Sequence, residues 1–216
     1  MTTPSPASPG VPARVFCIGR NYAEHARELD NPVPAEPVVF MKPATCLVRP
    51  GTAIPFPGHG RDLHHEVEVV LRIGAGGRHI SPDTAMSHVD AVTVGFDLTL
   101  RDVQQKLKAS GQPWEKAKAF EGSAPLGEWV PAGAVDVTAT KFRCYVGKTL
   151  RQEGDTREML FPIPELLAYL STIWSLTAGD VVFTGTPAGV GPVLPGDRLT
   201  AEADGIGRFV WDVTRR

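Results

Sequence analysis

Short apolar runs separated by turn-forming residues are the feature that most constrains how this chain can fold. The runs are rich in Val, Ile and Phe, and 22 glycines and 20 prolines interrupt them along the sequence. Apolar segments bounded in this way are typical of short β-strands joined by many turns. The sequence predicts such strands at 15–18, 38–41, 66–73, 91–100, 141–146, 180–184 and 208–213.

Two segments have the pattern of helices instead. From Pro164 to Trp174 the leucines recur at helical spacing with the tryptophan, and the proline suits the first helical position. A shorter helix is expected near Ser81, whose hydroxyl can cap it while Pro82 occupies its first turn. The predicted fold class is therefore mixed α/β but mainly β, a roll or sandwich with a few helices packed outside.

Domain organisation follows from composition. Residues 1–13 are rich in Pro, Ser and Thr, cannot bury enough apolar surface to offset their ordering entropy, and are expected to form a flexible tail. The remaining residues, 14–216, show one composition and no internal repeat, and their length suits one substantial core. We expect a single catalytic domain over this range.

Charge and cysteine usage exclude several classes of protein. A net charge of -2 gives no long-range attraction to nucleic acid or to an anionic membrane. No apolar run approaches the roughly 20 residues that span a bilayer. Cys17, Cys46 and Cys144 are far apart and form no CxxC pair, so neither a disulfide framework nor a zinc knuckle is indicated. We expect a cytoplasmic protein with no nucleic-acid or membrane partner.

An acidic pair in the segment HHEVEVVLRI is the first sign of chemistry. Glu66 and Glu68 alternate with Val67, and residues two apart on a strand project from the same face. Both carboxylates can therefore reach one ion. The apolar residues that follow indicate that this strand enters the core, where two like charges repel unless a cation lies between them. The alternative is a half-exposed strand with its polar face in water.

A third carboxylate completes an oxygen-donor set. Asp97 lies in an otherwise apolar run, where an acid is out of place unless it is bound to something. Asp102 follows at a strand-to-helix junction, and capping of that helix is the favoured interpretation for it. Carboxylates without suitably spaced His or Cys favour Mg²⁺ or Mn²⁺ over zinc.

Eight motifs occur in the order and spacing of the fumarylacetoacetate hydrolase family. They are 19-GRNYAEHARE-28, 40-FMKP-43, 64-HHEVEV-69, 95-GFDLTLRDVQ-104, 113-PWEKAKAF-120, 125-PLG-127, 179-GDVVFTGTPAGVG-191 and 196-GD-197. The chain resembles the short, single-domain branch that includes acylpyruvate and fumarylpyruvate hydrolases. This resemblance implies a mixed β-sandwich roll, a homodimer, and Mg²⁺ or Mn²⁺ held by Glu66, Glu68 and Asp97.

His25 and Glu28 are the candidates for moving a proton. They lie three residues apart, so one helical turn places them on the same face, where the carboxylate can orient the imidazole and raise its basicity. In the resembling family such a pair sits on a segment that orders over bound substrate. The alternative is a surface helix with an incidental histidine and a solvated acid.

The resemblance supplies the other candidate site residues. Lys118 matches a lysine of the family's active site, where it could bind a developing oxyanion. Lys116 is two residues away and would share its face if this segment were a strand. The motifs also match substrate-contacting positions of the family at Arg20, Arg101, Gln104 and Thr186.

The glycines of 185–191 need a separate explanation. No Lys-Ser or Lys-Thr follows them and no amphipathic helix begins there, so neither a P-loop nor a dinucleotide-binding motif is present. The resemblance places this turn against the substrate pocket, where glycines permit close approach. The alternative, a tight connection between strands, does not conflict with that role.

Together these features predict a metal-dependent hydrolase that cleaves the carbon-carbon bond of a 3-acylpyruvate-type diketo acid, such as fumarylpyruvate or acetylpyruvate. The His25-Glu28 pair favours hydrolysis, because hydrolysis needs a base that activates water. Oxaloacetate decarboxylation, or isomerisation of an unsaturated 2-oxo diacid, would use the same carboxylates and stays open. A protein that only binds a structural ion is the alternative from another class.

Overall fold

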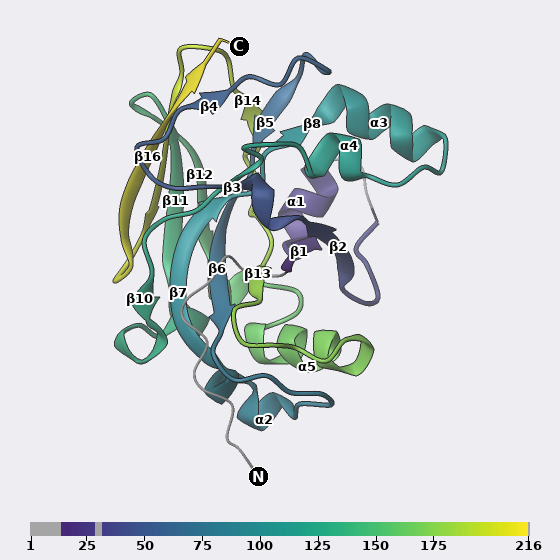
Figure 1. The fold of residues 1–216 in the computed structure, drawn as a ribbon, viewed down its shortest axis with the longest axis vertical. Coiled ribbons are helices and arrows are strands. Elements are labelled where there is room, and N and C mark those ends of the chain that lie inside the picture. Colours follow the sequence, from purple (N-terminus) through teal and green to yellow (C-terminus); the bar gives the residue numbers. More distant parts are fainter. Residues whose placement is uncertain (1–13, 29–31, 216) are drawn as a thin grey trace.

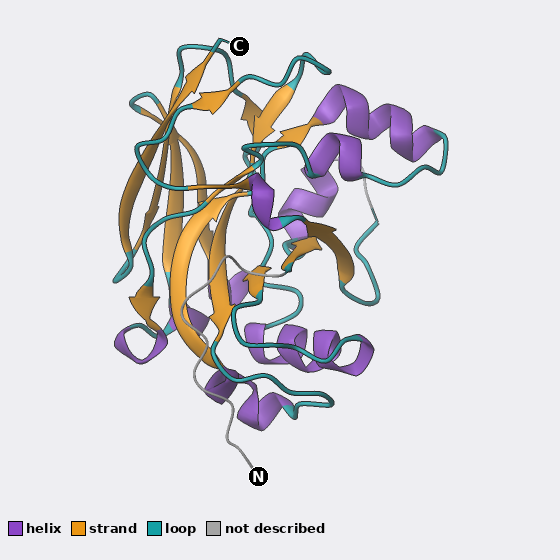
Figure 2. Cartoon of the chain, viewed as in Figure 1, coloured by secondary structure: helices purple, strands orange, loops and turns teal. Residues whose placement is uncertain are grey.

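The computed structural model describes residues 14–28 and 32–215, and its architecture is built on two large β-sheets with helices outside them (Figures 1 and 2). The predicted tail, residues 1–13, lies outside the described residues. The mainly β architecture with few helices confirms the fold class expected from the sequence. Within residues 14–28 and 32–215, no helix has the length and apolar character needed to cross a membrane.

The larger sheet contains the long, curved strands at the centre of Figure 1. In spatial order its strands are β10 (Val130–Pro131), β7 (Val89–Phe96), β6 (Val67–Ile73), β13 (Val181–Phe183), β1 (Val15–Gly19) and β2 (Val38–Lys42). Neighbours pair antiparallel except β1 with β13. Because β6 is paired on both sides and its residues are buried, it reads in sequence as a nearly continuous apolar run.

The second sheet lies to the left of the first in Figure 1. Its strands are, in order, β12 (Thr149–Asp155), β11 (Lys141–Val146), β15 (Arg198–Ala203), β16 (Gly207–Thr214) and β4 (Ile54–Pro55). Two small sheets join the ends of the large ones. One contains β14 (Gly191–Pro192), β5 (Leu63–His65) and β8 (Thr99–Leu100), and the other pairs β3 (Leu47–Val48) with β9 (Ala124–Pro125).

The helices are short and lie outside the sheets, as Figure 2 shows. The α-helices are α1 (Ala23–Glu28), α2 (Pro82–Ala85), α3 (Arg101–Ala109), α4 (Glu115–Lys118) and α5 (Ile163–Ile173). Single 3-10 turns are η1 (Ala44–Cys46), η2 (Met86–His88), η3 (Ala132–Ala134), η4 (Val137–Ala139) and η5 (Thr156–Glu158). The helix predicted from Pro164 is α5, and the oxygen of Ser81 caps α2 by accepting from the Asp83 amide, so both helix predictions are confirmed.

Aromatic contacts connect the layers of the core. Phe96 of β7 packs edge-on against Trp211 of β16, with ring centroids 5.7 Å apart, and both side chains are fully buried. On the other side of the larger sheet, Trp174 at the end of α5 packs on Phe16 of β1 at 5.3 Å. Such contacts bury large apolar areas and fix how the layers stack.

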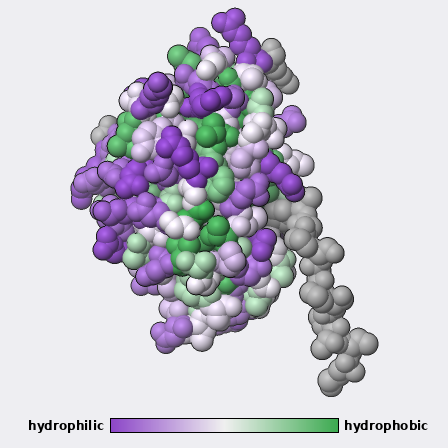
Figure 3. Space-filling model, turned by 90° about the vertical axis from the view of Figure 1, so that its left-hand side faces the viewer, coloured by the Kyte–Doolittle hydropathy of each residue, from purple (hydrophilic) through white to green (hydrophobic). Residues whose placement is uncertain are grey.

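The outer face of the second sheet carries many hydrophilic side chains, with hydrophobic ones between them near its centre, as the space-filling view in Figure 3 shows. Ion pairs join its strands, among them Arg143 with Glu153 and Arg208 with Glu202. Strands β12 and β15 carry many of these polar side chains. The sequence did not predict either strand, because polar and charged residues interrupt the apolar positions of both.

The structure corrects one strand boundary near the predicted site. The segment predicted as a single strand over 91–100 is β7 followed by β8, with a break at Asp97 and Leu98. At the break, the Leu98 amide donates to the carbonyl of Ser123 instead of to a neighbouring strand. Asp97 therefore lies at the end of a strand and not within one.

Gly95 in β7 is required by a close backbone approach. A Cβ atom at Gly95 would lie 2.4 Å from the carbonyl oxygen of Pro125 in β9, a distance that real Cβ atoms do not tolerate. Gly133, in an exposed 3-10 turn, has no atom within 4 Å of the corresponding position. The first glycine keeps β7 and β9 together beside Asp97, whereas the second has no packing role.

We expect Gly95→Ala to lower the free energy of unfolding by about 1–3 kcal/mol, because the backbone of β9 must shift to admit the methyl group. The matched substitution Gly133→Ala should change it by less than about 0.5 kcal/mol. Urea denaturation of the three proteins, followed by circular dichroism, measures both values. Equal stability of the two variants would show that β9 can move aside without cost.

Candidate metal centre and its pocket

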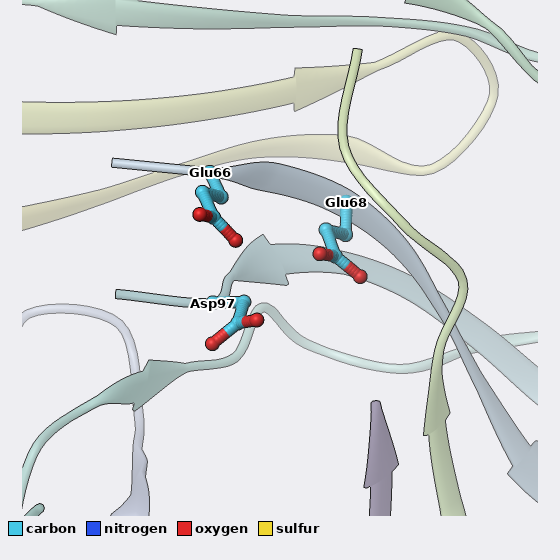
Figure 4. Close-up of side chains that lie close together, drawn as sticks. All are labelled: Glu66, Glu68 and Asp97. Carbon is cyan, nitrogen blue, oxygen red and sulfur yellow. The ribbon is translucent and has the colours of Figure 1, made fainter. Parts of the chain in front are cut away.

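Three carboxylates meet where β6 and β7 come together. Glu68 lies in β6, Glu66 lies just before it, and Asp97 lies just after β7. The antiparallel register pairs Val67 with Phe96, and the Asp97 amide donates to the Glu66 carbonyl at 2.9 Å. One carboxylate oxygen from each residue lies within 4.8 Å of the others (Figure 4). The alternation expected for the two glutamates therefore does bring them to one place.

Burial makes this arrangement electrostatically demanding. The exposed fraction is 4% for Glu66 and 1% each for Glu68 and Asp97. Like charges removed from water destabilise a fold unless cations compensate them. The half-exposed strand considered from the sequence is therefore wrong, because the chain around these residues is buried.

Three cationic side chains provide part of the compensation. Lys118 Nζ lies 2.7 Å from Glu66 Oε2 and 2.7 Å from Asp97 Oδ2. Arg101 donates to the other oxygen of Glu66. Lys42 Nζ lies 2.8 Å from Asp97 Oδ1, an ion contact without hydrogen-bond geometry.

These contacts keep Glu66 and Lys118 ionised. Burial alone would raise the pKa of Glu66, but the charges of Lys118 and Arg101 outweigh it and hold that pKa well below its usual range. Burial alone would lower the pKa of Lys118, but Asp97 and Glu66 outweigh it and raise that pKa.

Glu68 lacks such a partner. Its Oε2 accepts from the Gly185 amide at 2.7 Å, and among the described residues no Lys or Arg forms an ion pair with it. Burial, and then the charges of Asp97 and Glu66, raise the pKa of Glu68 well above its usual range. A cation placed among the three carboxylates would reverse this shift.

The donor set suits a hard divalent cation. Glu66, Glu68 and Asp97 offer only oxygen atoms, which Mg²⁺ and Mn²⁺ prefer, and no thiolate or imidazole competes within the cluster. Glu68 in particular needs a positive neighbour that the described protein does not provide. The acidic cluster can therefore hold Mg²⁺ or Mn²⁺.

Lys42 is a member of this site that the sequence analysis did not identify. It ends β2, its side chain is fully buried, and its ammonium group bonds to carbonyl oxygens of Lys118, Leu98 and Ser123. The ammonium group thereby links β2 to the segments that carry Lys118 and Asp97. A lysine closing the apolar run VVFMK was the available signal, because a lysine in a buried strand needs a partner.

His25 and Glu28 lie on α1 and are paired as their spacing predicted. His25 Nδ1 is 3.3 Å from Glu28 Oε2, and Glu28 Oε1 accepts from the Gly189 amide at 3.0 Å. Because Glu28 accepts at Nδ1, the other ring nitrogen is free to take up a proton. Burial lowers the pKa of His25 from its ordinary value, against the opposing effects of Glu66 and Glu28.

One pocket is lined by most of the residues singled out from the sequence. Its walls contain Arg20, His25, Glu66, Glu68, Arg101, Gln104, Lys118 and Thr186. Asp97 lies behind Lys118, and Glu28 contacts the pocket through His25. Residues distant in sequence thus converge on one volume.

Local geometry shapes two sides of this pocket. Arg20 follows β1 with a φ of 58°, a left-handed conformation that is uncommon for a residue other than glycine. Arg101 and Gln104 lie one turn apart in α3, where NH1 of the arginine donates to Oε1 of the glutamine at 2.8 Å. The Nε atom of Arg101 is buried without an acceptor among the described residues.

Two details of the sequence analysis are wrong. Asp102 does not cap α3, because the helix begins at Arg101 and the Asp102 carboxylate accepts from the amides of Arg61 and Asp62. The segment with Lys116 and Lys118 is the helix α4, not a strand. Residues two apart on a helix face in different directions, so Lys116 is exposed while Lys118 is buried.

Comparison with known proteins agrees with this geometry. The family model described as fumarylacetoacetate (FAA) hydrolase C-terminal matches residues 14–214. Oxaloacetate tautomerase YcgM of Escherichia coli (strain K12) is 45% identical over 195 residues, which are 89% of each chain. A mitochondrial oxaloacetate decarboxylase of Dictyostelium discoideum is 38% identical over 195 residues, again 89% of each.

A solved structure extends the likeness to the fold. Fumarylpyruvate hydrolase from Pseudomonas aeruginosa, crystallised with Mn²⁺ and pyruvate, superposes with a TM-score of 0.90. It is 36% identical, and the match covers 97% of this chain and 98% of that one. Its Mn²⁺ agrees with the oxygen-donor cluster found here. The chain belongs to the fumarylacetoacetate hydrolase family of metal-dependent enzymes.

Proposed function

We propose that the protein is a Mg²⁺- or Mn²⁺-dependent enzyme that interconverts the keto and enol forms of a small 2-oxo acid, with oxaloacetate as the substrate. The observation that carries this proposal is the position of His25. A buried imidazole that is neutral at neutral pH, oriented by Glu28, lines the same pocket as the acidic cluster. Proton transfer next to a polarised oxo group needs these two components together.

The charges around the site support a dianionic substrate. Lys42, Lys118 and Arg101 equal the three carboxylates in number, although they form ion pairs only with Glu66 and Asp97. A divalent ion held by Glu66, Glu68 and Asp97 would leave two excess positive charges in a buried place. A 2-oxo dicarboxylate would neutralise both, whereas a neutral molecule would leave them uncompensated.

The residues around the pocket have separate roles in enolisation. When bound, the divalent ion supplies Lewis-acid stabilisation of negative charge on the substrate's oxo oxygen. His25 would remove a proton from C3 of the keto form and transfer it to the oxo oxygen to give the enol, and Glu28 holds the imidazole in the tautomer that can do so. Lys118 lies where it can donate to an oxyanion. The unpaired Nε of Arg101 is available to the substrate carboxylate, with Arg20, Gln104 and Thr186 forming the remaining polar wall.

Hydrolysis of an acylpyruvate such as fumarylpyruvate is the second candidate. It is supported by the likeness to the Pseudomonas aeruginosa hydrolase over nearly the whole chain. The same His25-Glu28 pair would then activate water, and C–C cleavage would release pyruvate as its enolate. Decarboxylation of oxaloacetate would use the same electron sink without a base.

Homodimerisation and a cytoplasmic location stay predictions, and relatives named as mitochondrial show that the family is not confined to one compartment.

The activity is tested by offering purified protein oxaloacetate and fumarylpyruvate, with Mn²⁺ and with chelator. We expect rapid metal-dependent decay of the enol absorbance of oxaloacetate to its equilibrium value, without pyruvate release. Pyruvate is measured in parallel with lactate dehydrogenase. Release of pyruvate from fumarylpyruvate, with no effect on the enol of oxaloacetate, would replace the tautomerase proposal with the hydrolase. Release of pyruvate from oxaloacetate would indicate the decarboxylase.

The metal site is tested by Glu68→Gln. We expect this variant to lose Mn²⁺ affinity by roughly 100-fold or more, since even partners outside the coordination shell contribute 10–100-fold. Isothermal titration calorimetry measures the affinity directly, without reference to any substrate. Glu165→Gln makes the same chemical change on the exposed face of α5 and should bind Mn²⁺ as the wild type does. Equal affinities in both variants would remove Glu68 from the site.

The base is tested by pH dependence. Because burial lowers the pKa of His25, the acidic limb of kcat/KM should have its midpoint below the ordinary value of 6.5. Protonation removes the base, so the rate falls as the pH falls through this pKa. His25→Gln should lower kcat by about 10²–10⁴-fold and retain Mn²⁺ affinity. An acidic limb centred above 6.5, or full activity of the variant, would exclude His25 as the base.

A further inference from the structure

Gln152 is a buried polar residue that contacts two walls of the pocket without lining it. It lies in β12 with 1% of its surface exposed. Its carboxamide group lies between the segment that carries Glu66 and the turn that carries Thr186. The proposed proton transfer does not involve this residue.

The oxygen of the carboxamide faces the metal-site segment. Gln152 Oε1 accepts from the Val67 amide at 3.1 Å and lies 2.9 Å from Nδ1 of His65. Val67 and His65 are the two chain neighbours of Glu66. The glutamine therefore contacts the backbone on one side of that carboxylate, at Val67, and the imidazole of His65 on the other.

The nitrogen of the carboxamide faces the turn after β13. Gln152 Nε2 donates to the carbonyl of Pro187 at 2.9 Å and to Oγ1 of Thr186 at 2.8 Å. The orientation of the carboxamide is unambiguous, because the Val67 amide can only donate and the Pro187 carbonyl can only accept. A flipped carboxamide would lose both bonds.

This orientation decides the role of the Thr186 hydroxyl. Its oxygen accepts from Gln152, so its own hydrogen must point elsewhere, and within residues 14–28 and 32–215 it has no acceptor. Thr186 lines the pocket together with Glu66 and Glu68. We propose that Gln152 is a positioning residue that fixes the Thr186 hydroxyl as a hydrogen-bond donor to an anionic oxygen of the substrate. This inference rests on the proposed function, because it needs an anion in the pocket.

The backbone around Gln152 is adapted to this contact. The pairing of β11 with β12 shifts between Cys144 and Tyr145, so that Arg151 is an extra, bulged residue. A bulge redirects the side chain that follows it. Here Gln152 turns inward, whereas Leu150 is 46% exposed.

The pocket turn comes close to this bulge. A Cβ atom at Gly189 would lie 2.3 Å from the Arg151 carbonyl oxygen, and the φ of Gly189 is 95°. A glycine is required there on both grounds. Gly189 also donates to Glu28, so the turn that Gln152 holds supports the His25-Glu28 pair as well.

The test measures binding of oxalate, a dianionic mimic of the pyruvate enolate, to Mn²⁺-loaded protein by isothermal titration calorimetry. Thr186→Val should weaken oxalate binding about 10- to 100-fold, the size expected for a hydrogen bond to a charged group. Thr186→Ser keeps the hydroxyl and should bind oxalate nearly as the wild type does.

Gln152→Glu tests the positioning role. The carboxylate still accepts from the Val67 amide, but it has no N–H, so the Thr186 hydroxyl turns to donate to it. Oxalate binding should weaken about as much as in Thr186→Val, while Mn²⁺ affinity changes by less than about threefold, well below the 10–100-fold loss of a disturbed metal site. In a double variant that carries both Thr186→Val and Gln152→Glu, the second substitution should cause no further loss of oxalate affinity, because its effect passes through Thr186.

The double variant also separates positioning from simple repulsion by the added carboxylate. If Gln152→Glu weakens oxalate binding as strongly in the Thr186→Val background as in the wild type, its effect does not pass through the hydroxyl and the inference is overturned. Equal oxalate binding by wild type and Thr186→Val would overturn it too, and would leave the proposed function intact. If the wild type binds Mn²⁺ but no oxalate, both the role of Gln152 and the proposed function are overturned.

Discussion

The burial of three carboxylates in one small volume is the constraint on which the rest of this structure depends. Carboxylates removed from water destabilise a fold unless positive charge compensates them. That charge comes from β2, α3 and α4, which carry Lys42, Arg101 and Lys118. Elements that are far apart in sequence must therefore converge on the ends of β6 and β7, and the pocket lies where they meet.

The same constraint connects metal, base and substrate. The three cations equal the carboxylates in number, so a divalent ion held among them would leave the site with excess positive charge that suits an anion. The charge of Glu66 acts to raise the pKa of His25, but burial outweighs this effect, lowers that pKa and keeps the imidazole neutral. A neutral base beside a positive site can take a proton from a bound acid. Proteins similar to this chain are named as a tautomerase, a decarboxylase and a hydrolase.

Support for the pocket comes from the second sheet. The turn at 185–189 provides the Gly185 amide to Glu68, and it provides the Gly189 amide to Glu28. Gln152 and the bulge beside it hold this turn from behind. Strand β12, at the edge of the second sheet, thus helps determine the geometry of a site at the ends of β6 and β7 in the larger sheet.

The sequence by itself determined the mainly β fold class, two of the helices, the acidic cluster and the pairing of His25 with Glu28. Each of these depends on short-range regularity: strand alternation, helical spacing, or an acid in an apolar run. Tertiary structure alone decided that Lys42 reaches Asp97, that Asp102 binds a loop instead of capping a helix, and that Gln152 is buried. These outcomes depend on which distant groups are brought within hydrogen-bonding distance and on a one-residue bulge, and neither leaves a local pattern in the sequence.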